Sequence, residues 1–218
     1  MPIIRVRDKI IYFSHIPKCG GMSIELYLQK ITRGGLAFVD NDFSSYGSQK
    51  PWNLSSPQHI DGASLARLFK PDFFDAYFAV TRDPVSRFVS AFKFQKFFER
   101  KIKPEITVND FISSLDIQAI TRIGWCDNHF YPQVGFLYPG QSYHIFKIEH
   151  GLKNVKEYID RLLFNNILLL KMPHVNKSPA RKNEEQAELV LTESSIAKVK
   201  ELYAKDYELL DYLDSSLC

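Results

Sequence analysis

The segment IIYFSHIPKCGGMSIELYLQKI, residues 10–31, contains a strand signal, a tight loop and a helix signal in direct succession. Residues 10–15 are apolar, β-branched and aromatic, as in a buried strand, and Pro17 then ends the run. After two glycines, apolar side chains recur at helical spacing at Ile24, Leu28 and Ile31. A strand, a short loop and a helix in this order are typical of an α/β protein.

Strand and helix patterns continue to alternate along the rest of the chain. Residues 76–81 (AYFAVT) form a second buried-strand pattern, and a helix is expected from Pro84, because proline fits the first turn of a helix. Two more strands are expected at 144–148 and 168–171. Further helices are expected at 64–69, 107–115, 155–163 and 192–213, the last as one helix or a pair. The alternation predicts an α/β fold in a single domain, residues 1–218, with a mainly parallel central sheet flanked by helices.

Composition and charge limit the functions that the chain can have. Of its 218 residues, 45% are hydrophobic and 24% are charged, as in a globular protein. The net charge, 28 minus 25 or +3, is too small to predict a nucleic-acid partner. The three widely spaced cysteines indicate neither a disulfide framework nor a zinc site. Because the start lacks a signal-peptide pattern and no apolar run approaches the roughly 20 residues of a membrane span, we expect no membrane span and a cytoplasmic location.

The loop HIPKCGGMS, residues 15–23, has the parts of an anion-binding site. Gly20 and Gly21 allow the backbone to approach an anion, and the following helix offers free N–H groups and the positive end of its dipole. Ser23 adds a hydroxyl and Lys18 a mobile positive charge. The lysine precedes the glycines, so this is not the order of a Walker A loop. The loop therefore predicts binding of a phosphate or phosphosulfate group, with a merely structural turn as the alternative.

A second loop, RDPVSRFVS at residues 82–90, follows the second strand pattern. Arg82 lies at the end of that strand, where its guanidinium can bind a phosphate in bidentate fashion. Ser86 and Ser90 share one helix face with Arg87 nearby. Alone, this motif also fits an ordinary helix start with solvated charges. Two such loops at the carboxyl ends of two strands favour a shared anion site.

Together the two loops resemble motifs of the sulfotransferases that modify carbohydrates and related acceptors. HIPKCGGMS is similar to the 5′-phosphosulfate loop of that family, usually HIPKTGGTS, and RDPVSRFVSAF to its 3′-phosphate motif, R-D-P-x-x-R-x-x-S-x-[FY]. The similarity continues through NHFYPQVGFL, FKIEHG, PHVNKS and YAKDYELLDYL, at residues 128–137, 146–151, 173–178 and 203–213. The resemblance covers most of the chain and implies a P-loop-like nucleotide-binding architecture.

The resemblance also implies the reaction. A sulfuryl group would pass from 3′-phosphoadenosine-5′-phosphosulfate (PAPS) to a hydroxyl of a carbohydrate or small-molecule acceptor, by in-line displacement and without an essential metal. Lys18 would stabilise the leaving oxygen, while Arg82 and Ser90 would bind the 3′-phosphate. Cations of the late loop, Lys177, Arg181 or Lys182, would close over the nucleotide or form a solvated charge run. The implied donor-binding positions are Lys18, Cys19, Gly20, Gly21, Met22, Ser23, Arg82, Ser90, Lys177 and Arg181.

Two positions depart from the family pattern. Cys19 and Met22 stand where the family usually has threonines, so two hydroxyl donors to the phosphosulfate are missing. We expect weaker donor binding rather than its loss. A lowered pKa of Cys19, beside Lys18 and a helix N-terminus, and with it a reactive thiol, is the minor alternative.

A histidine is expected to remove the acceptor proton, because imidazole titrates near neutral pH. The first choice is His59, since family members carry a histidine between the two phosphate motifs. His129 is the second choice, or it contacts the acceptor together with Gln133. Asp61 and Glu149 are the carboxylates expected to orient the base, and the remaining histidines are expected to be structural or to shape the pocket. Trp52, Trp125, Phe130 and Tyr131 either stack on the acceptor or belong to the core.

No metal-ligand spacing is recognisable among the His, Cys and acidic residues. Two other functions remain open at this point. The substitutions at Cys19 and Met22 also fit a non-catalytic relative that holds a nucleotide or glycan. A P-loop-type kinase would need a Walker-type lysine and magnesium-binding carboxylates, neither of which the sequence contains in recognisable form.

Overall fold

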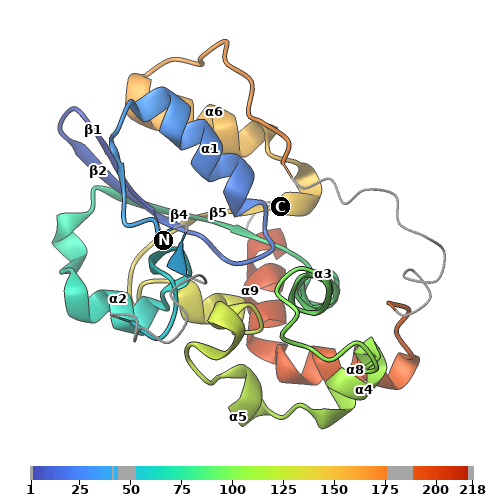
Figure 1. Ribbon diagram of the computed structural model, residues 1–218. Helices are drawn as coiled ribbons and strands as arrows, with labels where there is room; N and C mark the ends of the chain where they lie inside the picture. Colours follow the sequence, from blue (N-terminus) through green and yellow to red (C-terminus); the bar gives the residue numbers. More distant parts are fainter. Residues whose placement is uncertain (1, 41, 44–52, 176–188, 216–218) are drawn as a thin grey trace.

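A five-stranded mixed sheet, in the order β3-β1-β2-β4-β5, lies at the centre of the protein (Figure 1). The computed structural model describes residues 2–40, 42–43, 53–175 and 189–215. Three strands run parallel to one another: β2 (Lys9–Ser14), β4 (Ala76–Thr81) and β5 (His144–Lys147). The other two strands are β1 (Ile3–Val6), antiparallel to β2, and β3 (Leu36–Ala37), antiparallel to β1.

The three parallel strands confirm the predictions at 10–15, 76–81 and 144–148, but the sheet as a whole is mixed rather than mainly parallel. The strand expected at 168–171 is wrong. The backbone of Leu168 bonds to helix side chains instead: its N–H donates to Asp160 Oδ2 at 2.9 Å and its carbonyl accepts from Lys156 Nζ at 2.7 Å. Leu169 is fully exposed, so this apolar run is not used in the core.

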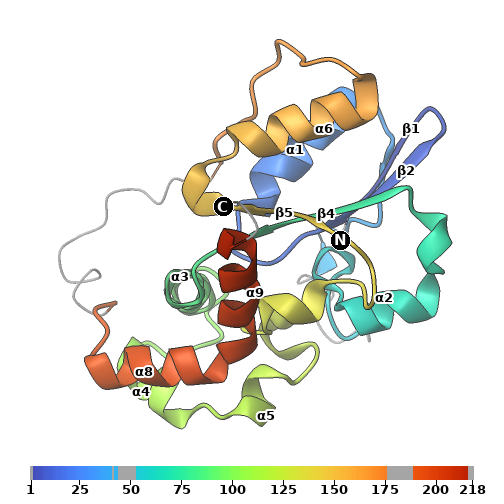
Figure 2. The same cartoon turned by 180° about the vertical axis from the view of Figure 1, so that it is seen from behind.

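Helices cover both faces of the sheet. In both views α1 and α6 lie together on one face, while α2, α3 and the α8–α9 pair lie on the other side (Figures 1 and 2). In the described ranges, no helix is long and apolar enough to cross a membrane. The bounds are α1 (Gly21–Thr32), α2 (Gly62–Leu68), α3 (Pro84–Phe97), α4 (Val108–Ser114), α5 (Ile117–Ile120), α6 (Lys153–Phe164), α8 (Glu193–Leu202) and α9 (Ala204–Ser215).

The helices follow the signals in the sequence. Pro84 occupies the first turn of α3, and the capping box between Thr107 and Asp110 starts α4. The region at 192–213 forms two helices, α8 and α9. Much of the remaining chain consists of short 3₁₀ turns, at Pro57–His59, Pro71–Phe73, Trp125–Asn128, Gln133–Phe136 and Ile148–His150.

Two hydrophobic clusters account for the high aromatic content. The first joins the sheet to α1 and α6 and includes Phe13 and Phe78, whose rings stack at 4.7 Å between centroids. The second lies between α3, α4 and α8 and includes Phe88, Phe92 and Phe130. Each fully buried phenylalanine contributes about 1.5–3 kcal/mol relative to an exposed one. The aromatic side chains therefore build the core that holds the loops at the strand ends.

Candidate active site

The two strand-to-helix loops lie side by side because β2 and β4 are adjacent and parallel. Ser14 pairs with Ala79 in the sheet, so both strands end at the same edge. Across the gap between the loops, Nη1 of Arg82 donates a hydrogen bond to the Lys18 carbonyl at 3.3 Å. The structure thus brings together the two loops that the sequence singled out, at the edge where parallel sheets collect ligands.

The first loop needs glycine at two positions, for different reasons. Gly20 has φ +82° where it caps α1, a left-handed conformation that L side chains rarely adopt. At Gly21 a Cβ atom would lie 1.9 Å from the imidazole of His15. That imidazole is buried, and its Nδ1 lies 2.5 Å from Oε1 of Glu25 on α1. His15 therefore supports the loop from below, as expected of a structural histidine.

The Lys18 ammonium is partly desolvated and surrounded by positive charge. Its Nζ lies 4.0 Å from the centroid of the Phe94 ring, a cation–π contact. Burial, with the nearby charges of Arg82 and Lys93, lowers the pKa of Lys18 to about 8. Grouped cations repel one another, and a polyanion relieves that repulsion. The arrangement is therefore suited to a ligand with several negative charges.

The substituted positions of the first loop behave differently from each other. Cys19 is buried, with Sγ 3.7 Å from the Pro17 carbonyl and 3.6 Å from Gln133 Oε1. Burial raises the pKa of the Cys19 thiol to about 12, so the alternative of a lowered pKa is wrong and the thiol stays protonated at neutral pH. Met22 is half exposed. Ser23 is buried, and its Oγ accepts a hydrogen bond from Val175 N–H at 3.2 Å.

In the second loop the backbone of Arg82 is held by Gln133. The Arg82 N–H donates to Gln133 Oε1 at 2.9 Å, and Gln133 Nε2 donates back to the Arg82 carbonyl at 2.8 Å. Gln133 is fully buried. The sequence suggested that Gln133 contacts the acceptor together with His129. In the structure its amide instead holds the backbone of the second loop. Ser90 lies half-buried on α3, two turns after Arg82.

Arg87 is a buried support whose role the sequence did not reveal. Its Nε donates to the Pro17 carbonyl at 3.1 Å, and its Nη2 donates to the carbonyls of His129 at 3.1 Å and Tyr131 at 2.8 Å. One guanidinium therefore ties the first loop and the segment 129–131 to helix α3. An arginine in a helix start normally looks like a solvated charge, so the sequence carried no signal for this contact.

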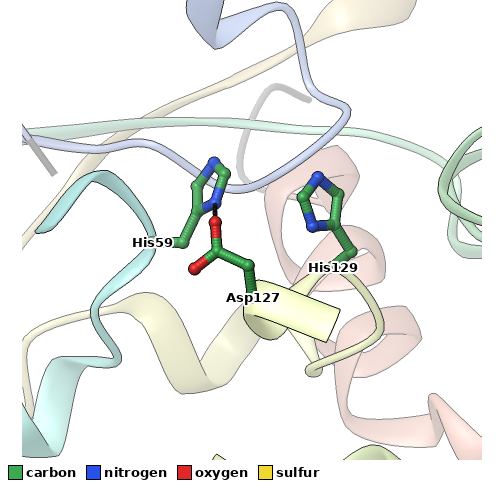
Figure 3. A group of neighbouring side chains, drawn as sticks. All are labelled: His59, Asp127 and His129. Atoms are coloured by element: carbon green, nitrogen blue, oxygen red, sulfur yellow. Dashed lines mark hydrogen bonds and ion pairs between the residues drawn. The ribbon is translucent and has the colours of Figure 1, made fainter. Parts of the chain in front are cut away.

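His59 and Asp127 form a hydrogen-bonded pair beside the loops (Figure 3). Nδ1 of His59 lies 2.7 Å from Asp127 Oδ2. Asp127 also accepts from the Ser56 N–H at 2.6 Å and the Ser56 hydroxyl at 2.9 Å. Burial acts to raise the pKa of Asp127, but His59 and the Ser56 bond outweigh it and hold the pKa well below its ordinary value. With Nδ1 engaged by a carboxylate, Nε2 of His59 is left for a reacting proton.

Asp127, rather than Asp61 or Glu149, is thus the carboxylate that orients His59. Asp61 caps α2 by accepting from Ser64 N–H at 2.9 Å, and Glu149 accepts from Asp83 N–H at 2.8 Å in the second loop. Residues 126–128 all have positive φ, between 48° and 60°, and this turn directs the Asp127 carboxylate back toward the segment before α2. A pairing between groups 68 residues apart gives no local sequence signal.

His129 lies next to this pair. The centroids of the His59 and His129 rings are 5.1 Å apart, and His129 stacks on Phe94 at 4.9 Å. Burial and the neighbouring His59 lower the pKa of His129 well below its ordinary value, so its imidazole is neutral at pH 7. His15 is also close to His59, with ring centroids 5.0 Å apart. His59 therefore neighbours two other histidines, and one of them, His129, stacks on the same Phe94 ring that Lys18 contacts.

His59, Asp127 and His129 each offer one ligand atom within 4.8 Å of the others, so the same three groups could also hold a divalent cation. No spacing signal in the sequence indicated this group, because its members come from two distant segments. The direct hydrogen bond between His59 and Asp127 equally suits proton transfer, and the group has the chemistry for either task.

An open cavity of about 470 Å³ adjoins the turn that carries Asp127. Trp125 lines it, but its ring also packs on the buried Phe130, with centroids 5.1 Å apart, so these aromatic residues belong mainly to the core. Tyr131 packs against Phe136. The lining residues are Leu54, Lys101, Arg122, Ile123, Gly124, Trp125 and Cys126.

Lys177, Arg181, Lys182 and Trp52 fall outside the described residues. His144 stacks on Tyr158 with ring centroids 4.3 Å apart, and His150 and His174 are exposed.

Comparison with known proteins places the chain in one family. A family model described as the sulfotransferase family matches residues 2–213, which include both loops and the His59–Asp127 pair. No curated protein and no solved structure matches the chain. The match supports sulfuryl transfer rather than the phosphoryl transfer of a kinase. The chain belongs to the sulfotransferase family and is a transferase.

Proposed function

We propose that the protein transfers the sulfuryl group of PAPS to a hydroxyl of a carbohydrate or small-molecule acceptor, with a P-loop-like site for the donor. The observation that carries the proposal is the contact between Arg82 and the Lys18 carbonyl, which sets two cationic loops next to each other. PAPS carries a phosphosulfate at the 5′ position and a phosphate at the 3′ position. Two adjacent anion-binding loops match two anionic groups on one adenosine.

The donor is bound by groups of both loops. Gly20, Gly21 and the first turn of α1 offer backbone N–H groups to the 5′-phosphosulfate, together with Ser23 and the backbone of Cys19 and Met22. Arg82 and Ser90 bind the 3′-phosphate. The cluster of Lys18, Arg82 and Lys93 supports this assignment, because its mutual repulsion falls when a polyanion binds.

His59 acts as the general base. Its Nε2 takes the proton of the acceptor hydroxyl while the acceptor oxygen forms a bond to sulfur. The bond between sulfur and the bridging oxygen of the 5′-phosphate breaks, and the departing charge is neutralised by Lys18. Asp127 holds the His59 ring through Nδ1 and stabilises the imidazolium that forms. The leaving product is adenosine 3′,5′-bisphosphate.

The acceptor approaches from the cavity beside the Asp127 turn. Cys126 lines this cavity, and the next residue, Asp127, holds the base. His129 is neutral and its ring is close to that of His59, so it is placed to accept or donate one hydrogen bond to the acceptor. A carbohydrate or a small polar molecule has the hydroxyls that such a site needs.

Transfer of ³⁵S from labelled PAPS to a panel of hydroxyl acceptors tests this function. We expect labelled product with the wild type, and a loss of about 10²–10⁴-fold in kcat for His59→Ala, with binding of adenosine 3′,5′-bisphosphate retained. His144→Ala, at the first residue of β5 and so at the opposite end of the parallel strands from the loops, serves as the control and should keep its turnover. A His59→Ala enzyme with nearly full activity would move the base to His129. Bisphosphate binding without transfer to any acceptor would favour a non-catalytic relative.

A further inference from the structure

A single buried amide, that of Gln133, connects the two anion-binding loops. Its Oε1 accepts from the Arg82 N–H at 2.9 Å, and its Nε2 donates to the Arg82 carbonyl at 2.8 Å, so both backbone groups of Arg82 are held by one side chain. The same Oε1 lies 3.6 Å from the thiol of Cys19 in the first loop. Gln133 is fully buried. It therefore contacts both loops, through the Arg82 backbone and the Cys19 thiol, while the Arg82 guanidinium donates to the Lys18 carbonyl.

The backbone of Gln133 is itself fixed by the C-terminal helix. Asp206 on α9 accepts from the Gln133 N–H at 2.9 Å and from the Val134 N–H at 3.0 Å, and its side chain is fully buried. The two carboxylate oxygens thus hold the start of the Gln133–Phe136 turn. A chain of contacts runs from α9 through Gln133 to Arg82, and from the Arg82 guanidinium to the Lys18 carbonyl.

We infer that Gln133 is a positioning residue that makes the site selective for a nucleotide phosphorylated at both its 3′ and 5′ positions. The inference rests on the proposed function. The Arg82 guanidinium can distinguish such a nucleotide from a 5′-monophosphate only if its distance from the first loop matches the spacing between the 3′- and 5′-phosphates. Gln133 sets that distance by fixing Arg82 N–H and carbonyl relative to Cys19, so that little reorganisation is needed on binding.

A positioning role for Gln133 and a merely stabilising role predict different effects on nucleotide selectivity. If Gln133 only filled space, its replacement would lower the stability of the fold and weaken the binding of all nucleotides by the same factor. If it positions Arg82, its replacement weakens binding of adenosine 3′,5′-bisphosphate while binding of adenosine 5′-phosphate changes much less. The ratio of the two dissociation constants therefore separates the two roles.

The experiment measures this ratio by calorimetry, together with the melting temperature, for the full chain. Gln133→Met removes both hydrogen bonds to Arg82 while keeping a side chain of similar length. Gln133→Glu keeps the acceptor for the Arg82 N–H but loses the donor to the Arg82 carbonyl. Gln95→Met is the matched control: Gln95 is equally buried, and its Nε2 donates to the Cys126 carbonyl at 3.4 Å, away from both loops.

We expect the wild type to prefer the bisphosphate, and Gln133→Met to reduce that preference by about 10-fold, because a displaced Arg82 guanidinium loses a charge-assisted hydrogen bond to the 3′-phosphate. The preference of Gln133→Glu for the bisphosphate should lie between those of Gln133→Met and wild type. Gln95→Met should have a lower melting temperature but the wild-type ratio of dissociation constants. Should Gln133→Met fail to fold, Gln133→Leu, which also removes both hydrogen bonds and adds no charge near the anion site, carries the test.

Gln133 variants with a lower melting temperature and an unchanged ratio would overturn the inference and leave the proposed function intact. A wild-type protein that binds the two nucleotides equally would contradict the proposed donor site itself, and the inference would fall with it.

Discussion

Asp127 decides which nitrogen of His59 is free to act. Because Nδ1 of His59 lies 2.7 Å from the Asp127 carboxylate, a proton on Nδ1 is stabilised there, and Nε2 remains for the acceptor in the proposed reaction. Ser56 holds the carboxylate with two further bonds, so Asp127 cannot easily rotate away. Orientation of the base is therefore a property of three neighbouring side chains and not of His59 alone.

We expect Asp127→Asn to lower kcat by roughly 10²-fold, because an amide at this position no longer stabilises the imidazolium that forms during transfer. Binding of adenosine 3′,5′-bisphosphate should stay unchanged. Asp61→Ala is the control: Asp61 caps α2, so removing its carboxylate should lower the melting temperature without a comparable loss of kcat. Steady-state kinetics and calorimetry on both variants check this. Equal losses of kcat in the two would show that Asp127 has no special role.

We expect Lys18 to make the proposed reaction dependent on pH. Burial and the nearby cations lower the pKa of Lys18 to about 8, below its ordinary 10.5. Only the protonated amine can neutralise the leaving phosphate, so kcat/KM, which reports the free enzyme, should fall as pH rises through about 8. In Lys18→Arg the guanidinium stays charged, and this basic limb should disappear even if the rate is lower. A pH–rate profile of both proteins tests the expectation. An unchanged basic limb in Lys18→Arg would assign it to another group.

Among the secondary-structure elements, α3 does more than carry the second loop. Through Arg87 it also binds the carbonyl of Pro17 in the first loop and those of His129 and Tyr131. The first loop and the segment 129–131 are therefore both bound to α3 by one guanidinium. The same helix supplies Phe94, which contacts both Lys18 and His129.

We expect Arg87→Lys to lower the free energy of unfolding by about 2–4 kcal/mol. A lysine ammonium cannot reach all three carbonyls in the fork geometry of a guanidinium, so buried acceptors are left without donors. Arg67→Lys is the control, because Arg67 lies on α2 and donates to Ser64 Oγ in an exposed position. Urea unfolding of both variants measures the difference. Similar unfolding curves for the two would contradict the proposed support by Arg87.

The elements that could be predicted from the sequence are those with a clear local pattern. The strands β2, β4 and β5 and the helices α3, α4 and α6 have apolar periodicity, a helix-starting proline or a capping box, and these features act within a few residues. The antiparallel strand β1 is short and depends on pairing with β2. At 168–171, by contrast, an apolar run that looks like a strand is bound by Lys156 and Asp160 instead.

For the molecule as a whole, the site combines predictable and unpredictable parts. Lys18, the glycines and Arg82 could be predicted because glycines and cations close together after a strand are typical of phosphate-binding loops, and because parallel strands end at one edge of a sheet. Asp127, and the buried roles of Arg87 and Gln133, depend on contacts between distant segments and on an unusual turn at 126–128. Such contacts follow from the assembled fold, so no pattern in one segment could have indicated them.

The central claim is that the two loops bind opposite ends of one doubly phosphorylated adenosine. Calorimetry with adenosine 3′,5′-bisphosphate, adenosine 5′-phosphate and adenosine 3′-phosphate tests it most directly, using wild type, Lys18→Ala and Arg82→Ala. Arg82→Ala should weaken binding of the two ligands with a 3′-phosphate by about 10- to 100-fold and leave binding of adenosine 5′-phosphate unchanged. Lys18→Ala should weaken binding of the two ligands with a 5′-phosphate. If each variant weakened all three nucleotides to the same extent, the two loops would not bind separate ends of one donor, and the account would be contradicted.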